Sequence, residues 1–596
     1  MPRLPSGRPR VLVALALLAL AAPARAQTEG LLQIEDALHT FLEDQQALGR
    51  LPGVALGAKP LSAYEAHALL DTLAARTTAD PDAFSSLDRR LLAQYRGEAV
   101  GGLLSSAVAG VPWLYRNGTT ALSVEGEDFG IEAEPLAVLA YGPVRQTQSQ
   151  MREGTSSAWQ NTRGVRAAGH LDIGAGFGRV FFETRIEENQ ARPPAAVYAF
   201  REGTAPRLGF VARPSEDVYD YFVATGVVGY HTRRFEARFG RDRNRWGFGR
   251  ESVVLSNYPT VYDQLQLRWK VWRLDFTNLF ARFTEPDRIT GTGLLDSRYG
   301  AFHRLAIDLG YGLEAEAFES IIFVADSTGR GGFEVAYLNP FQFYRGTERE
   351  LGSPDNVLLG AGLAWTAAPG LRAYGQFILD ELKVSEFFNA WWGNKWAYLV
   401  GATVVDPPLP GGSRARGLSL RVEYARLRPY LYAHRALCPD QGAGCPPLNA
   451  QPPGAAYVHY GDVLGHPAGP NASDLALSAR YRPVPDVAVA LDVVFTRLGR
   501  NELAEDGTVL VNYGSDPNVP FNSRPEESED SAETLWGVRQ NRILLEARTE
   551  VRLLPQLFAG GVLRYGSVDD DQVGLNRYLS PQLMLRWGLP FPSLRY

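Results

Sequence analysis

The sequence contains little cysteine and no long apolar run beyond its first residues. Two cysteines in 596 residues cannot provide a disulfide framework, so the fold does not depend on disulfide bonds. After the N-terminus, no segment approaches the roughly 20 consecutive apolar residues that a membrane-spanning helix needs. A helical membrane protein is therefore excluded.

Excess positive charge and familiar catalytic motifs are also missing. The formal net charge is −6, whereas a protein that binds nucleic acid would need a basic face. Neither His-Glu-x-x-His nor Gly-x-Ser-x-Gly occurs in the chain. We therefore expect no nucleic-acid partner, no enzymatic activity, no catalytic residue, and no metal or other cofactor.

The N-terminus has the pattern of a cleaved signal peptide. A basic start precedes an apolar run at residues 11–22, which is too short to cross a bilayer as a helix. Residues 24–26 then give the small-x-small pattern that signal peptidase recognises. The basic residues are Arg3, Arg8 and Arg10. We expect residues 1–26 to be removed, which takes away four arginines and moves the net charge from −6 to −10.

Residues 30–97 show the spacing of three short amphipathic helices. The first ends at Gly49, the second begins at a capping box formed by Ser62 and Glu65, and the third begins near Ser85. Helices this short need a surface to pack on, and the floor of a barrel could provide one. The sequence therefore predicts a small α-helical domain, residues 27–118, on the periplasmic side.

From about residue 119 the apolar period changes to two, as in β-strands. In the hairpin at residues 475–495, apolar residues alternate with Arg480 and other polar residues around a turn at 483–486. A second hairpin places Glu546 and Arg548 at alternate positions. Charges at every second position would be expelled from a solid core, but a water-lined lumen accepts them. We expect these three side chains to point inward in an all-β transmembrane antiparallel barrel, residues 119–596.

The connections between strands alternate between short turns and long links. Counting back from a last strand at about 577–589 gives about eighteen strands, and an even number places both termini in the periplasm. The long links are then extracellular loops, and the cell outer membrane is the expected location, with its lipid and lipopolysaccharide as partners. The last strand, with Tyr596 at the terminus, looks like the signal for the barrel-insertion machinery, although the tail after Gly588 departs slightly from that pattern.

Several motifs follow one another in a recognisable order. They are Gly49-Arg50-Leu51-Pro52, Lys59-Pro60-Leu61-Ser62, Trp246-Gly247 with Leu255-Ser256-Asn257, the segment from Phe333 to Arg345, Trp391-Trp392-Gly393-Asn394-Lys395, and the segment from Leu464 to Ala472 followed by Asp474. In this order they resemble the Wzi family of capsule-assembly outer-membrane proteins, over most of the chain from residue 30 to about 500. The resemblance implies an eighteen-stranded barrel closed below by helices. It also implies a lectin-like, non-catalytic role in attaching or assembling capsular polysaccharide or exopolysaccharide.

A site for acidic polysaccharide needs aromatic faces to stack on sugar rings and cations to pair with carboxylates, for which the planar arginine fork is well suited. Two predicted outer loops, 241–263 and 383–396, provide both. We take as the polysaccharide-binding hypothesis Arg241, Arg243, Arg245, Trp246 and Arg250 from the first loop, and Trp391, Trp392, Lys395 and Trp396 from the second.

Structural roles compete with this hypothesis. The three tryptophans of the second loop could form an aromatic girdle at the membrane interface, and the arginines of the first could pair with acids in the lumen. The segment 339–345 and the motif Gly465-His466-Pro467 are more typical of loop shape than of a binding or metal site. The acidic residues of loop 499–541 favour solvation over calcium binding. We expect a local disulfide between Cys438 and Cys445, which lie close together in a proline- and glycine-rich stretch.

Two other functions stay open. One is a porin-like channel for small solutes or saccharides, gated by the N-terminal helices. The other is an outer-membrane hydrolase with a serine–histidine pair at the barrel rim. Its candidates are His231, His303, His434 and His466, and nothing in their spacing selects one.

Overall fold

The structure is a computed structural model that describes residues 30–591 with internal gaps. The gaps are 109–110, 112, 148–156, 175–176, 194–203, 206–207, 216–217, 287–294, 325–332, 352–354, 387–388, 437–453 and 530–531. The predicted signal peptide, the predicted disulfide between Cys438 and Cys445, and Tyr596 lie outside the described residues.

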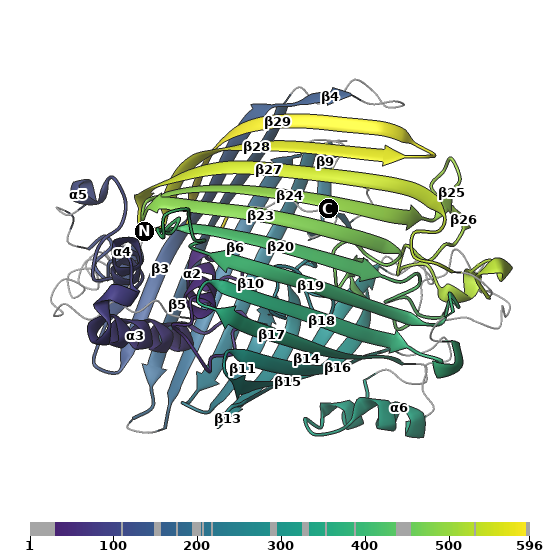
Figure 1. Cartoon of the computed structure of the whole chain (residues 1–596), viewed down its shortest axis with the longest axis horizontal. Coiled ribbons are helices and arrows are strands. Elements are labelled where there is room, and N and C mark those ends of the chain that lie inside the picture. Colours follow the sequence, from purple (N-terminus) through teal and green to yellow (C-terminus); the bar gives the residue numbers. More distant parts are fainter. Residues whose placement is uncertain are drawn as a thin grey trace, which may run out of the picture.

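Eighteen antiparallel strands of the described chain form one closed barrel, which confirms the predicted fold class (Figure 1). The barrel strands are β3 (Phe129–Pro143), β5 (Ser157–Asp172), β6 (Arg179–Arg192), β10 (Val218–His231), β11 (Phe235–Asp242), β13 (Tyr262–Val271), β14 (Leu274–Pro286), β15 (Leu295–Gly310), β16 (Leu313–Phe323), β17 (Asn356–Ala368), β18 (Leu371–Glu381), β19 (Lys395–Val405), β20 (Leu418–Leu427), β23 (Ala472–Val484), β24 (Val487–Arg500), β27 (Val538–Leu554), β28 (Leu557–Asp570) and β29 (Gly574–Trp587).

The barrel closes where its last strand meets its first. Strand β29 pairs with β3 between Leu583 and Trp587. The free edge at the start of β3 is taken up by β2 (Leu122–Glu125), and β4 (Arg145–Thr147) pairs with the start of β29. The remaining short strands are β1 (Ala58–Lys59), β7 (Thr204–Ala205), β8 (Gly209–Phe210), β9 (Ala212–Ser215), β12 (Arg245–Trp246), β21 (Val458–His459), β22 (Asp462–Val463), β25 (Glu502–Leu503) and β26 (Val509–Val511).

The alternation predicted for the strands is confirmed. Glu546 is buried inside the barrel, where its carboxylate lies 2.9 Å from Arg564 Nε and 3.5 Å from Arg548 Nη1. Arg480 reaches the carboxylate of Asp44, which belongs to a helix inside the barrel, at 2.7 Å. On the outer face, Leu583 is 78% exposed. The wall is therefore apolar outside and charged inside.

The two ends of the barrel differ in the length of their connections. One end, here called the short-turn end, carries tight turns such as 232–234, 272–273, 485–486 and 555–556. The opposite, long-loop end carries long links such as 243–261 and 501–537, with the three-residue link 571–573 as an exception. This alternation agrees with the predicted pattern of turns and loops.

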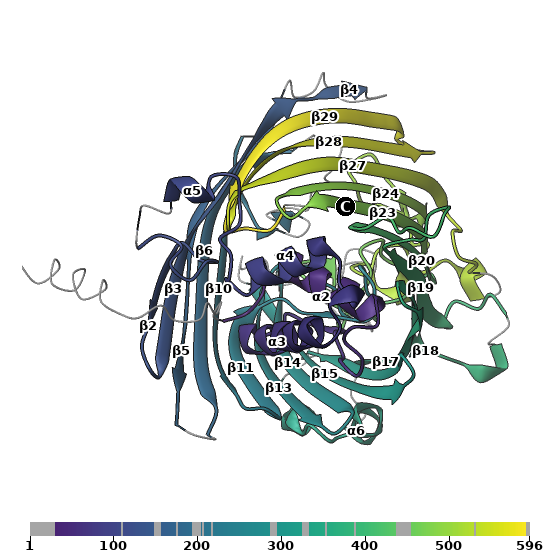
Figure 2. The same ribbon diagram turned by 60° about the vertical axis from the view of Figure 1, so that its left-hand side comes forward.

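The three predicted N-terminal helices are present at the short-turn end, where Figure 2 shows them in the barrel mouth. The helices of the chain are α2 (Ala37–Ala47), α3 (Ala63–Ala79), α4 (Ser86–Tyr95), α5 (Ser105–Val108) and α6 (Tyr344–Leu351), with 3-10 turns η1 (Pro81–Ala83), η3 (Val335–Leu338), η4 (Val384–Glu386), η6 (Phe521–Ser523) and η7 (Glu526–Glu529). Within the described ranges, every helix is too short or too polar to span a membrane.

The capping box predicted at Ser62 is only half formed. The Ser62 hydroxyl accepts a hydrogen bond from the Glu65 backbone N–H at 3.4 Å. The Glu65 carboxylate instead contacts Arg268, at 2.9 Å, and Lys270 on β13. Two cations attract the carboxylate more strongly than one backbone N–H would. A reciprocal box is found one helix later, between Ser85 and Asp88.

A hydrophobic core occupies part of the lumen. Trp246, Val253 and Leu255 come from the link between β11 and β13, and Tyr432 and Tyr457 come from the link between β20 and β23. These side chains pack against inward-facing residues of the wall. Both links therefore fold into the barrel.

The segment after β29, residues 588–591, also turns inward. Gly588 has a φ of +65°, and its carbonyl accepts a hydrogen bond from the Gln33 side chain at 3.2 Å. Beyond it, the Phe591 ring lies 4.3 Å from the guanidinium carbon of Arg548 on the inner wall. The described part of the tail that departs from the insertion-signal pattern, residues 589–591, thus packs inside the barrel.

Candidate functional site

The first predicted binding loop is an inner segment, residues 243–261, which lies in the lumen. Its strand β12 pairs with β1, so that Trp246 lies opposite Ala58 and Arg245 opposite Lys59. Trp246 is only 1% exposed. The prediction of an outward loop is therefore wrong for Arg245, Trp246 and Arg250, because the N-terminal segment offers the inner segment a backbone partner inside the barrel.

The link between β20 and β23 covers the inner segment from the long-loop side. The hydroxyl of Tyr432 donates to the carbonyl of Val253 at 2.6 Å, and the hydroxyl of Tyr457 donates to that of Val254 at 2.7 Å. His466, from the Gly-His-Pro motif, accepts a hydrogen bond from the Ala468 backbone at 3.2 Å. That motif shapes the loop, as the structural alternative predicted.

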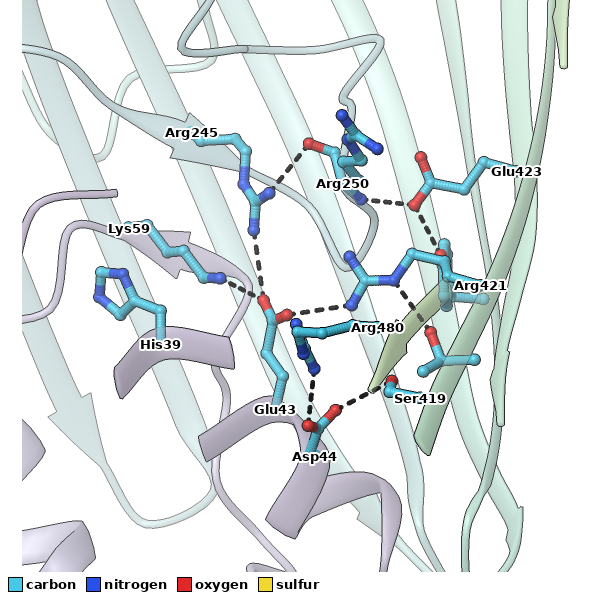
Figure 3. A network of polar contacts seen from close by, with 12 residues as sticks. His39, Glu43, Asp44, Lys59, Arg245, Arg250, Ser419, Arg421, Glu423 and Arg480 are labelled. Atoms are coloured by element: carbon cyan, nitrogen blue, oxygen red, sulfur yellow. Dashed lines mark hydrogen bonds and ion pairs between the residues drawn. The ribbon is translucent and has the colours of Figure 1, made fainter. Parts of the chain in front are cut away.

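A network of charges joins α2 to the inner segment and the wall (Figure 3). Glu43 accepts from Lys59, from Arg245 at 3.3 Å and from Arg421 on β20 at 3.1 Å. Asp44, next to it, accepts from Arg480 at 2.7 Å and from the Ser419 hydroxyl at 3.3 Å. Figure 3 shows the two acids on one helix, facing cations from β1, β12, β20 and β23.

Burial and neighbouring charges shift the pKa values of this network in different ways. Burial alone would raise the pKa of Glu43, but the charges of Lys59, Arg421 and Arg245 hold it well below its usual value. For His39, on the same helix, burial outweighs the neighbouring charges. Burial lowers its pKa to about 3, so the ring is neutral and accepts a hydrogen bond from the Leu61 backbone at 3.2 Å.

The other arginines of the first loop also have partners, but they do not gather around one site. Arg250 pairs with Asp492 on β24 and donates to the Ser478 hydroxyl at 2.7 Å. Arg243 lies 3.6 Å from Glu35, near the N-terminal helices. Arg241 points to the outer face, 3.4 Å from Asp263. Arg243, Arg245 and Arg250 therefore follow the alternative of pairing with acids in the lumen.

Two polar cavities remain beside α2. Their volumes are about 200 and 210 Å³, and Arg480 and Arg548 line both of them. Each is smaller than the roughly 300–1,000 Å³ of a typical ligand pocket. Acids such as Asp44 and Asp492 share their walls, so the lining carries both signs of charge.

The second predicted loop forms a half-buried cluster at the long-loop end, here called the rim cluster. Its members are Lys383, Trp391, Trp392, Phe521, Arg524 and Glu529. The two indole rings lie 5.5 Å apart, and both N–H groups donate to Glu529, at 3.2 and 3.1 Å. The Arg524 guanidinium lies 3.7 Å above the Trp392 ring, and the Lys383 ammonium lies 5.1 Å from the Trp391 ring.

Trp396 lies apart from the rim cluster, whereas the ammonium of Lys395 lies 4.9 Å from the ring of its member Phe521. Lys395 is fully buried and pairs with Asp380 at 3.0 Å and Glu381 at 3.4 Å. Trp396 lies on the outer face, with its ring 6.4 Å from Phe377 and 6.0 Å from Tyr398. Such an outward aromatic row near a strand end is typical of a membrane-interface girdle.

Sequence reasoning missed the residues that complete these sites. Phe521, Arg524 and Glu529 lie about 130 positions after Trp391 and were covered only by the interpretation of loop 499–541 as solvated acids. Glu43 and Asp44 were hidden in a helix chosen for its apolar stripe. No cluster of three potential metal-ligating residues occurs in the described part of the chain.

No protein-family model and no curated protein matches this chain. Among solved structures, it is similar to Wzi, an outer membrane protein involved in group 1 capsule assembly in Escherichia coli and a carbohydrate-binding β-barrel. That comparison gives a TM-score of 0.51 and 13% identity, covering 95% of this chain and 100% of Wzi. Pseudomonas aeruginosa OprD gives a TM-score of 0.37 and 10% identity, over 76% of this chain and 94% of OprD. The likeness to Wzi shows a shared fold.

Proposed function

We propose that this protein is a non-catalytic outer-membrane barrel that holds acidic polysaccharide at the cell surface. In this proposal the N-terminal helices lie in the periplasm and the long-loop end faces outward. The rim cluster is the observation that carries the proposal. The similarity in fold to a carbohydrate-binding barrel supports it.

The rim cluster has the chemistry that an acidic sugar polymer requires. Trp391 and Trp392 present two indole rings on which apolar sugar faces can stack, and both rings are held by hydrogen bonds to Glu529. Arg524 and Lys383 place cations beside those rings. A sugar carboxylate can displace Glu529 from Arg524 and take over a charge-assisted contact.

The inner segment has a supporting role in this proposal. Arg245, Trp246 and Arg250 are held inside the barrel, where they connect α2 to the wall. They fill the lumen beneath the loops and do not contact the polymer. The polysaccharide-binding set is therefore reduced to the rim cluster.

The test compares two tryptophan variants in purified protein. The Trp391→Ala/Trp392→Ala double variant should bind the purified surface polysaccharide of the source cells about tenfold more weakly, a loss of roughly 1.4 kcal/mol. Trp396→Ala is the matched control, since it removes an indole from the outer face of the same region. Neutral dextran serves as the control ligand, and heat-modifiability on gels checks that each barrel is folded.

Equal binding by the double variant and the control would refute the choice of site. Equal retention of polysaccharide on intact cells with and without the protein would refute the function itself.

A porin-like channel is the second candidate, and the two polar cavities beside α2 favour it. Arg480 and Arg548 line both cavities, and an ion pair between Asp44 and Arg480 holds α2 beside them. In planar bilayers, the intact chain should show no ion conductance if the hydrophobic core closes the lumen. Steady conductance of the intact chain would favour the channel over the proposed binding function.

A further inference from the structure

Three polar side chains form a row on the outer face of the barrel, where lipid would be expected. Asn278 on β14 lies opposite His303 on β15, which in turn lies opposite Glu319 on β16. All three face outward, since their neighbours Thr277 and Arg304 point into the lumen. All three are nonetheless buried, and Asn278 is completely so. Exposed to hydrocarbon, such groups would cost several kcal/mol.

The row is covered by an outer segment, residues 333–351, which is part of the link between β16 and β17. Figures 1 and 2 show its helix α6 outside the barrel wall. The Tyr344 ring stacks on His303 with centroids 4.1 Å apart, and its hydroxyl lies 2.7 Å from His303 Nε2. The Arg345 backbone N–H donates to Glu319 at 3.1 Å. The outer segment therefore contacts His303 and Glu319 from outside, whereas both side-chain polar atoms of Asn278 are buried without a hydrogen-bond partner.

Helix α6 exposes Arg349, Glu350 and Leu351. Over residues 333–343, the exposed side of the outer segment is mainly apolar. Its exposed apolar residues are Phe333, Val335, Leu338, Phe341 and Phe343. Phe341 is 79% exposed, yet one side of its ring packs 5.8 Å from Phe276 and 6.3 Å from Trp269, both on the outer wall. The apolar surface of the segment is thus continuous with that of the barrel. A contiguous exposed patch of this kind marks an interaction surface.

The backbone of the segment is suited to apolar surroundings, where polar groups must be satisfied internally. It consists mainly of the 3-10 turn η3 and helix α6. Between them, the side chain of Asn339 accepts a hydrogen bond from the Phe341 backbone N–H at 3.1 Å. The backbone carbonyl of Asn339 accepts one from the Gln342 backbone N–H, also at 3.1 Å. The Gln342 side chain donates to Thr347 at 2.6 Å. Asn339 and Pro340 therefore set a turn that meets its own hydrogen-bonding needs, as the structural alternative predicted.

We propose that the outer segment is a membrane-embedded cover. Its apolar side contacts the acyl chains of the surrounding lipid, and its polar side shields the Asn278–His303–Glu319 row on the barrel wall. This inference rests on the proposed location of the barrel in the outer membrane. It adds a lipid-binding surface outside the strands.

Spin-label accessibility in lipid bilayers tests the proposal. With Cys438 and Cys445 replaced by serine, a nitroxide is placed at Phe341→Cys in the full-length barrel. Val384→Cys is the matched control, because Val384 is also an apolar loop residue that is 79% exposed. Leu305→Cys reports on the outer wall itself. Collisions with oxygen report on lipid, and collisions with a water-soluble nickel chelate report on water.

We expect the ratio of oxygen to nickel accessibility to be severalfold higher at Phe341 than at Val384, and close to that at Leu305. Nickel accessibility at Phe341 equal to that at Val384 would overturn the proposal. Low accessibility of Phe341 to both reagents would also overturn it, since a second copy of the chain would then cover the segment. Nickel accessibility at Leu305 would instead refute the membrane location on which the proposal rests.

Discussion

The inner segment and the rim cluster started from the same kind of sequence and reached opposite environments. Both combine tryptophan with basic residues in a link at the long-loop end. The inner segment found a backbone partner in β1 and a carboxylate in Glu43, and is buried in the lumen. The rim cluster found Glu529 on a neighbouring loop and stayed half exposed. Composition therefore does not decide whether such a loop is buried or exposed; the partners available to it do.

The largest expected effect is on stability and comes from the buried tryptophan of the inner segment. Trp246→Ala should lower the free energy of unfolding by about 3–5 kcal/mol, because it leaves a cavity in the lumen core. Trp396→Ala removes the same group from the outer face and should cost much less. Denaturant titration of both variants in lipid vesicles provides the measurement. Equal losses would show that the lumen core relaxes around the missing indole.

Removing one charge from the inner network should have the next largest effect. Glu43→Gln leaves Lys59, Arg245 and Arg421 without their shared carboxylate, and loss of one partner of a buried ion pair typically costs about 3 kcal/mol. Asp263→Asn, at the half-exposed pair with Arg241, should be nearly neutral. The same denaturant titration distinguishes them, and an unaltered Glu43→Gln protein would show that α2 is held by packing alone.

The inner network should also be sensitive to acid, through His39. Its pKa falls from 6.5 to about 3 on folding, so the unfolded chain binds one more proton between these values. The stability contributed by the neutral ring is complete above pH 6.5 and is lost as the pH falls toward 3. The slope should be about 1.4 kcal/mol per pH unit. His39→Gln keeps a hydrogen-bonding side chain without titrating, and a pH series should show a shallower acid slope for this variant. An identical slope would place the sensitivity elsewhere.

The smallest expected effect is on polysaccharide binding and concerns the exposed rim cluster. Arg524→Gln removes the cation above Trp392 and should weaken polysaccharide binding about fivefold, or roughly 1 kcal/mol. Arg539→Gln is the control, since Arg539 is an exposed arginine paired with Asp571 near the same end of the barrel. Titration calorimetry with the purified polysaccharide measures both. If the two variants lose affinity equally, the effect is general charge and not the cluster.

Local patterns were enough to predict the wall and the helices. The alternation around Arg480 and Glu546 placed both side chains inside, because a strand's period of two depends only on nearby residues. The start of the third helix near Ser85 was likewise predicted from nearby residues, although its capping box with Asp88 was not. The inner segment could not be predicted this way, since Trp246 pairs with Ala58 across 188 positions. The position of the outer segment could not be predicted either, because nothing in residues 333–345 indicates that they fold back over His303.

The position of α2 has a consequence for how the molecule is assembled. This eleven-residue helix is too short to persist alone in water. Lys59, which also pairs with Glu43, is near in sequence, but the other cations that hold the helix come much later in the chain: Arg245, Arg421 and Arg480 lie 202, 378 and 436 positions from their partners on the helix. The helix therefore gains most of its ion pairs only when distant strands are in place. Closure of the barrel and docking of α2 in its lumen are therefore coupled steps of folding.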